Sequence, residues 1–217
     1  SVYALGELNF YGKNGTMRAK NCRTCSQTRQ CPFFFDITKV KSHMDIYVAN
    51  EKYDGYLRDG CVFRNDVNIF DKMAATIHYK NGVQVAYSLT TYSPYEGYRI
   101  AFNGTKGRLE AWIQESRKTS DVNYDEIVLF KNFSKREYIH IPFGTSGHGG
   151  GDALLKDQLF LPNVDDPYCQ CANSRDGALA CLVGIAARNS IATKQPVKIA
   201  DLTSISPMKK KQYKRIL

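Results

Sequence analysis

A chain of 217 residues with 43% hydrophobic and 12% aromatic residues can bury a sizeable core, which excludes an intrinsically disordered protein. No apolar run approaches the roughly 18 residues that a membrane-spanning helix needs, so we expect no membrane partner. The net charge of +9 would suit an anionic partner, but the acid-free tail 206–217 carries five of the cations. We expect this tail to be frayed and solvated, and no nucleic acid to bind.

The N-terminal part combines one strand with irregular sequence. Residues 2–11 read as a first strand, and residues 22–35 form a cysteine-rich connector. Residues 38–53 are short, mixed sequence to which no element is assigned. The chemistry of this part therefore rests on its cysteines.

Three thiols, those of Cys22, Cys25 and Cys31, lie within ten residues at the spacing C-x₂-C-x₅-C. A structural zinc site needs four ligands, so Cys61, Cys169, Cys171 or a histidine would have to complete it. The alternative is a set of buried free thiols in a reducing cytosol. In both interpretations we expect the three thiols to lie close together, because one short connector carries them.

The middle of the chain predicts an antiparallel meander. Asn81-Gly82 predicts a two-residue hairpin turn, and Asn103 to Gly107 predicts a second reversal. Consecutive hairpins pair antiparallel, since parallel neighbours would need long crossovers. The predicted strands cover residues 72–79, 83–91, 98–102, 108–113, 126–131 and 136–142.

Two helices follow the strands. Residues 152–160 carry leucines four apart, with Asp152 placed to cap the helix or complement its dipole. Residues 176–191 carry an apolar stripe flanked by small residues that permit close packing on a sheet. Strands followed by helices predict an α+β fold.

Several motifs along the chain resemble one known family. The segments are YKNGVQVAYSLTTYSPYEGYRIAFNGTKGRLE from Tyr79, the HGGGD motif at His148, DGALACLVGIAARNSIATKQPVKIADL from Asp176, and the cysteine connector ending in CPFF. Their order resembles the C-terminal, substrate-binding domain of the Gfo/Idh/MocA (glucose-fructose oxidoreductase/inositol dehydrogenase) oxidoreductases, with a bias to the bacterial sugar-processing branch.

The resemblance implies a fold and a function. The fold is one α+β domain over residues 1–217, an open, mainly antiparallel β-sheet with helices packed on one face. The function is to bind a sugar or cyclitol and to form a homodimer or higher homo-oligomer within an NAD(P)-dependent oxidoreductase. The cytoplasm is the favoured compartment, with the periplasm as the alternative.

The family's dinucleotide-binding motif, G-x-G-x-x-G after a strand, has no match in this sequence. The nearest segment, Gly147 to Asp152, has Asp where the third glycine belongs and lacks the parallel βαβ unit. We therefore expect NAD or NADP to be bound by an N-terminal Rossmann domain absent from this sequence. This domain would also supply the family's usual catalytic lysine, so we expect no cofactor binding and no catalysis by the chain alone.

The best candidate site is the segment His148-Gly149-Gly150-Gly151-Asp152. Its glycines let backbone N–H groups approach a ligand at a helix N-terminus, and its imidazole could act as an acid or base. The alternative is a plain entry turn. The resemblance favours a substrate-facing role for His148 and Asp152.

A second candidate group is the aromatic and charged cluster that contains Tyr95 and Arg99. Aromatic faces stack on the C–H faces of a sugar while charged ends bond its hydroxyls. The alternative is a strand edge with a solvated Glu96–Arg99 ion pair.

Two other functions remain open at this point. One is a glycosidase of the same family, which uses NAD catalytically and does not consume it. The other is a non-catalytic assembly or binding module that pairs through an uncovered sheet face.

Overall fold

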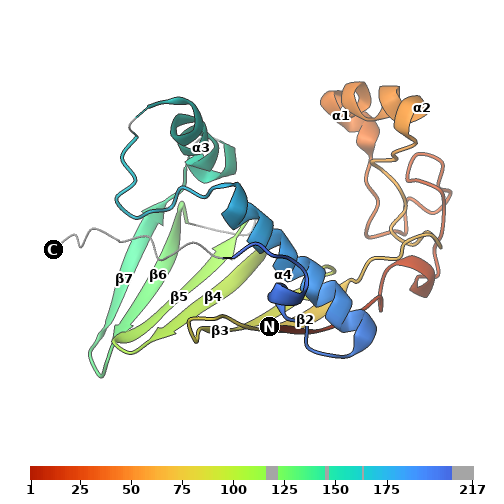
Figure 1. Cartoon of the computed structure of the whole chain (residues 1–217). Coiled ribbons are helices and arrows are strands. Elements are labelled where there is room, and N and C mark those ends of the chain that lie inside the picture. The colour runs from red at the N-terminus through yellow and green to blue at the C-terminus, as the bar shows by residue number, and fades with distance from the viewer. Residues whose placement is uncertain (116–121, 145–146, 163, 207–217) are drawn as a thin grey trace. The chain divides into compact units, whose positions relative to one another are not determined.

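A computed structural model of the chain describes residues 1–115, 122–144, 147–162 and 164–206 (Figure 1). The chain divides into two compact units, the first formed by residues 1–92 with 179–205 and the second by residues 93–178 with 206–217. The tail that the sequence predicts to be frayed lies, from residue 207 onward, outside the described residues.

The first unit contains a three-stranded antiparallel sheet of β1 (Val2–Glu7), β2 (Lys72–His78) and β3 (Gln84–Thr90), in that order. The β2–β3 hairpin closes through three residues, because the N–H of Tyr79 still donates to the carbonyl of Val83, 2.9 Å away. Gly82 takes the left-handed conformation at φ 88°. The observed loop is thus one residue longer than the predicted two-residue turn. Gly82 supplies the positive φ that this longer loop requires.

The second half of helix α4 (Ser174–Thr193) packs on β1 and forms the core of the first unit. The N–H of Ala4 donates to Ser190 Oγ at 3.0 Å, deep in this contact. A side chain at Gly6 would lie 2.7 Å from Ile191 Cδ1, so the strand and helix approach closely. This packing accounts for the buried side chains Val2, Ala4, Ala186, Ser190 and Ile191.

A long, loop-rich excursion connects β1 to β2 in the first unit. Its helices are all short, which explains why residues 38–53 show no clear periodicity in the sequence. The excursion contains η1 (Gly12–Asn14), η2 (Ile37–Lys39), α1 (Lys41–Ile46), η3 (Val48–Asn50) and α2 (Glu51–Asp54). One more short helix of this unit, η6 (Ile199–Asp201), follows α4 near the C-terminus.

The second unit is built on a four-stranded antiparallel meander, in the order β4-β5-β6-β7. The β4–β5 reversal pairs Gly104 with Gly107, which matches the predicted glycine-rich turn. After the sheet come the 3₁₀ turn η5 (Gly147–Gly150) and helix α3 (Gly151–Phe160). The strands are β4 (Gly97–Gly104), β5 (Gly107–Gln114), β6 (Tyr124–Lys131) and β7 (Arg136–Pro142).

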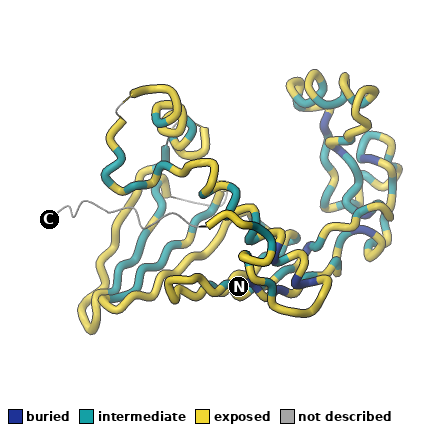
Figure 2. Tube along the Cα trace, viewed as in Figure 1, coloured by how far each residue is buried: buried dark blue, intermediate teal, exposed yellow. Residues whose placement is uncertain are grey.

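The two faces of this four-stranded sheet differ in chemistry. Alternation along each strand, read with the pairing register, places aliphatic and aromatic residues on one side, which we call the apolar face. Its larger members at the two outer strands remain 40–58% exposed. Figure 2 shows the strands of this sheet as half-buried or exposed. The apolar face comprises Tyr98, Ile100, Phe102, Leu109, Ala111, Ile113, Ile127, Leu129, Ile139 and Ile141.

The predicted α+β class and the antiparallel strand pairing are confirmed. The strands divide between two sheets, and helix α4 packs on the first of them through its second half. Within the described part of the chain, no helix is both long and apolar enough to cross a membrane.

Candidate functional site

An open cavity of about 260 Å³ lies at one end of the apolar face in the second unit. Tyr98 and Ile113 are direct cross-strand partners on β4 and β5. Because Ala111 pairs with Ile127, the register brings Asp125 of β6 into the same row and onto the same face. The complete lining is Tyr98, Ile113, Gln114, Glu115, Asp125, Phe143, His148 and Gly149.

The glycine-rich segment after β7 supplies one wall of this cavity. Three successive residues take left-handed backbone conformations, His148 at φ 48°, Gly149 at φ 65° and Gly150 at φ 98°. Such a conformation is uncommon for a residue with a side chain, although histidine adopts it more readily than most, and the side chain of His148 is 87% exposed. A Cβ at Gly144 would lie 2.0 Å from the carbonyl oxygen of Gly149, so the turn requires glycine there.

The side chains of His148 and Asp152 form a pair. The His148 Nδ1 atom lies 2.8 Å from Asp152 Oδ1. Asp152 makes no capping bond to α3, whose N-cap is Gly150, but it lies in the first turn, where an acid complements the helix dipole. Of the two predicted roles, the cap is therefore wrong and the dipole role holds, and the same carboxylate bonds the imidazole. With Nδ1 bonded to a carboxylate, Nε2 is the ring atom left to bind a ligand. His148 lines the cavity, whereas Asp152 stands behind it.

Tyr95 and Arg99 occupy a different place from His148. The guanidinium carbon of Arg99 lies 4.3 Å from the centre of the Trp112 ring, and Tyr95 lies 6.2 Å from the same ring. Arg99 follows Tyr98 directly on β4, so their side chains leave opposite faces of the sheet. The structure therefore separates the two pairs of predicted substrate residues, and only the His148 pair adjoins the cavity.

The cavity also contains acidic residues that sequence reasoning did not select. Glu115 and Asp125 place two carboxylates beside the imidazole of His148 and the ring of Tyr98. The backbone N–H of Glu115 donates to the carbonyl of Glu96 at 3.0 Å, which fixes the end of β5. The only sequence signal for these residues is their position in one cross-strand row, which depends on the register.

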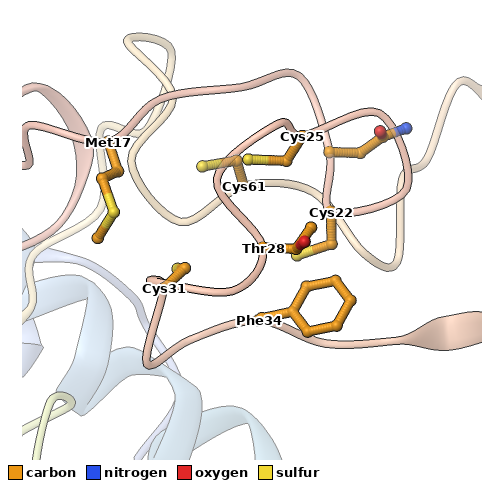
Figure 3. A pocket seen from close by; sticks show the side chains of 8 residues that line it. Met17, Cys22, Cys25, Thr28, Cys31, Phe34 and Cys61 are labelled. Carbon is orange, nitrogen blue, oxygen red and sulfur yellow. The ribbon is translucent and has the colours of Figure 1, made fainter.

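A second, smaller cavity of about 20 Å³ lies in the first unit (Figure 3). The thiols of Cys22, Cys25 and Cys31 line it together with Cys61, so the connector cysteines do share one site. Burial raises the pKa of the Cys22 thiol, a backbone hydrogen bond from Phe35 lowers it, and the neighbouring acidic groups add a further upward shift. As they stand, no three His, Cys, Asp or Glu side chains of the described residues converge tightly enough to hold a metal ion.

The η5 turn does not fit the phosphates of a dinucleotide. Its preceding strand, β7, pairs antiparallel with β6, whereas the dinucleotide motif requires a parallel βαβ unit. The carboxylate of Asp152 occupies the position where that motif needs its third glycine. We therefore derive no step of a reaction from a cofactor bound to this turn.

Residues 34–199 match the family described as "Oxidoreductase family, C-terminal alpha/beta domain" of the Gfo/Idh/MocA proteins, and the chain belongs to this family. It is also 31% identical over 219 residues to "Putative oxidoreductase YteT" of Bacillus subtilis (strain 168). That alignment covers 93% of this chain and 51% of the relative, so the chain spans about half the length of the curated relative.

Proposed function

We propose that this chain is the substrate-binding part of an NAD(P)-dependent oxidoreductase that acts on a sugar or cyclitol. The observation that carries the proposal is the cavity of about 260 Å³ lined by His148, Glu115, Asp125 and Tyr98. Its volume lies just below the usual range of ligand pockets, roughly 300–1,000 Å³, which suits a single sugar ring. Its acceptors and donors suit a molecule with several hydroxyl groups.

Each lining group has a distinct task in this proposal. The carboxylates of Glu115 and Asp125 accept hydrogen bonds from substrate hydroxyls, and charged acceptors make the stronger bonds. The rings of Tyr98 and Phe143 offer flat apolar surfaces to the C–H face of the ring. The Nε2 atom of His148, oriented through Nδ1 by Asp152, binds or exchanges a proton at one hydroxyl.

The cofactor belongs to another part of the intact protein in this proposal. A nicotinamide, when bound there, supplies hydride transfer at the substrate carbon. The residues of this chain hold that carbon in position. An NAD-dependent glycosidase would use the same cavity, and the consumption of free cofactor separates the two, because only the dehydrogenase turns it over.

Steady-state kinetics of the full-length enzyme test the cavity. If Asp125 binds a hydroxyl, Asp125→Asn raises KM about tenfold, which corresponds to the loss of one good hydrogen bond. If His148 moves a proton, His148→Ala lowers kcat by about 10²–10⁴-fold. Arg99→Ala is the matched control, because Arg99 lies on the opposite face of the same sheet. Unchanged kinetics in both cavity variants would reject this site.

The proposal also includes self-association through the apolar face. The chain carries a net charge of +9, so two copies repel unless they meet at an uncharged surface. The apolar face offers such a surface, and the acids Glu115, Asp125 and Glu137 lie at its ends. A pair of identical sheet faces related by a two-fold axis would bury it in both copies at once.

A further inference from the structure

We propose that Cys22, Cys25, Cys31 and Cys61 form a structural Zn²⁺ site that joins two loops of the first unit. The site is independent of the proposed substrate cavity. It lies at the small cavity that Figure 3 shows, with sulfur atoms from both loops around it. Four cysteine sulfurs with no histidine are the ligand set of tetrahedral zinc or iron–sulfur sites.

Backbone pairing brings the fourth cysteine to the other three. Asn21 and Gly60 form an antiparallel bridge, and the N–H of Cys22 donates to the carbonyl of Asp59 at 2.8 Å. The N–H of Cys61 donates back to the carbonyl of Lys20 at 3.3 Å. Cys22 and Cys61 are therefore held on adjacent strands of one small ladder, although 39 positions separate them in the sequence.

The thiols already have some of the hydrogen bonds that metal-bound sulfur needs. The N–H of Gln27 donates to Cys25 Sγ at 3.4 Å, and the backbone of Phe35 hydrogen-bonds the Cys22 sulfur, although burial has the larger effect and raises the pKa of this thiol overall while no metal is bound. Backbone donors of this kind stabilise negative sulfur and orient the ligand. A buried apolar lining without a cation would instead keep these groups protonated.

The local charge also favours a thiolate–metal site. Four thiolates on one Zn²⁺ leave a net charge of −2. The segment 8–35, which supplies three of the thiols, carries five cations and no acid, namely Lys13, Arg18, Lys20, Arg23 and Arg29. Arg23 is already paired with Asp59 and Glu51, so the other four cations are the ones that offset the excess negative charge of the site.

The size of the cavity selects a single ion. A volume of about 20 Å³ has room for about one water-sized sphere, which requires roughly 10–15 Å³. A multi-iron cluster needs more space. The sulfurs do not yet converge at ligand distance in the described structure, so binding requires the side chains to turn about χ1, which has three accessible staggered positions.

A zinc ion here would compensate for the poor packing of the surrounding loops. In the excursion between β1 and β2, the buried apolar side chains are Ile37 and Phe63. Small regions with so little core are commonly stabilised by a metal or by disulfides. The site would tie residues 20–31 to residues 57–64, so that removing the metal loosens this region first.

Elemental analysis of the whole chain, purified without chelator, tests the proposal. We expect about one zinc per chain, and Co²⁺ exchange should give the charge-transfer and visible bands of a tetrahedral thiolate site. Cys61→Ser should reduce bound zinc to background, whereas the control Cys181→Ser, at an exposed position on α4, should retain it.

The wild-type chain alone gives a decisive reading if Cys61→Ser fails to fold. Removal of the metal by a chelator should lower Tm, and added Zn²⁺ should restore it. The proposal is overturned if the untreated protein contains no metal. It is equally overturned if iron replaces zinc, or if thiol titration shows these four cysteines to be paired as disulfides.

Discussion

The two compact units differ in how they are held together. In the described residues, every buried side chain belongs to the first unit, whereas the second unit has none (Figure 2). The first unit nevertheless contains long irregular stretches, and the second consists largely of regular strands. Regular secondary structure and a buried core are therefore distributed in opposite ways along this chain.

Buried polar groups explain how the irregular unit stays ordered. The carboxylate of Asp71 accepts backbone N–H bonds from Asn9, Phe10 and Tyr11 at 2.8–2.9 Å. Asp59 is likewise buried and bonds the backbone and side chain of Arg23 at 2.9–3.0 Å. Loops lack ladder partners, so their backbone groups need acceptors of this kind. The second unit satisfies its backbone within the sheet but leaves its apolar face exposed.

The largest expected effect comes from Asp71. Asp71→Ala leaves three backbone N–H groups without their acceptor, and each buried unsatisfied group costs about 1–3 kcal/mol. We expect the free energy of unfolding to fall by about 3 kcal/mol or more in urea titrations. Asp66→Ala, which removes an exposed carboxylate from the same region, should change it by less than about 0.5 kcal/mol. If the two variants lowered the free energy of unfolding equally, the buried, hydrogen-bonded carboxylate of Asp71 would contribute no more to stability than the exposed carboxylate of Asp66.

The pH dependence of stability isolates the charge of the same residue. Burial by itself would raise the pKa of Asp71, but bonds from the Asn9, Tyr11 and Phe10 backbone lower it overall. A lowered pKa in the folded state gives stability that is complete above the unfolded value, about 3.9, and is lost as pH falls through the folded value.

We therefore expect the wild type and Asp71→Asn to differ by a constant unfolding free energy above about pH 5. Below about pH 4 the difference should shrink, since the carboxyl of the unfolded wild-type chain is then protonated while the folded carboxyl, with its lowered pKa, still is not. Urea titrations over this range measure it. A difference that grows on acidification would show that Asp71 is charged only weakly in the folded protein.

Self-association tests the exposed face of the second unit. Ile139 lies on the apolar face and Tyr138 on the opposite face of the same strand. Ile139→Lys should weaken the dimer at least about tenfold, because a charge would be buried at the interface. Tyr138→Lys should leave it unchanged. Sedimentation at several concentrations measures the self-association of both variants. If the wild-type protein is a monomer at high micromolar concentration, the apolar face does not pair with a second copy of this chain.

The smallest effects compare a loop glycine with a helix glycine. Gly149 has φ 65° with open space around it, so Gly149→Ala should destabilise the protein by about 1 kcal/mol through backbone strain. Gly184 lies inside α4, also in open space. Gly184→Ala should stabilise the protein by about 0.5–1 kcal/mol, because alanine favours the helix. Thermal unfolding of both variants checks the two signs.

Local pattern was sufficient to predict most of the regular elements. The predicted strand 136–142 coincides with β7, and the predicted helix 152–160 differs from α3 by one residue. Alternation and helical periodicity are properties of neighbouring residues, so they can be read from the sequence directly. The same reasoning fixed the α+β class and the antiparallel pairing, and the motifs indicated the family. It left residues 38–53 unassigned because helices of one turn carry too few residues for a period.

Only the tertiary structure decided which distant residues meet. Tyr98 and Asp125 share one cavity because three strands are paired in a particular register, and a slip of one residue would move either to the other face. The same alternation places Arg99 on the sheet face opposite Tyr98, so the second candidate group predicted from the sequence lies apart from the cavity that His148 lines. Cys61, instead of Cys169 or Cys171, joins the connector thiols because a bridge between residues 21 and 60 brings it there. Such contacts depend on the folded path of the whole chain, whereas sequence patterns report only on residues that are neighbours in the sequence.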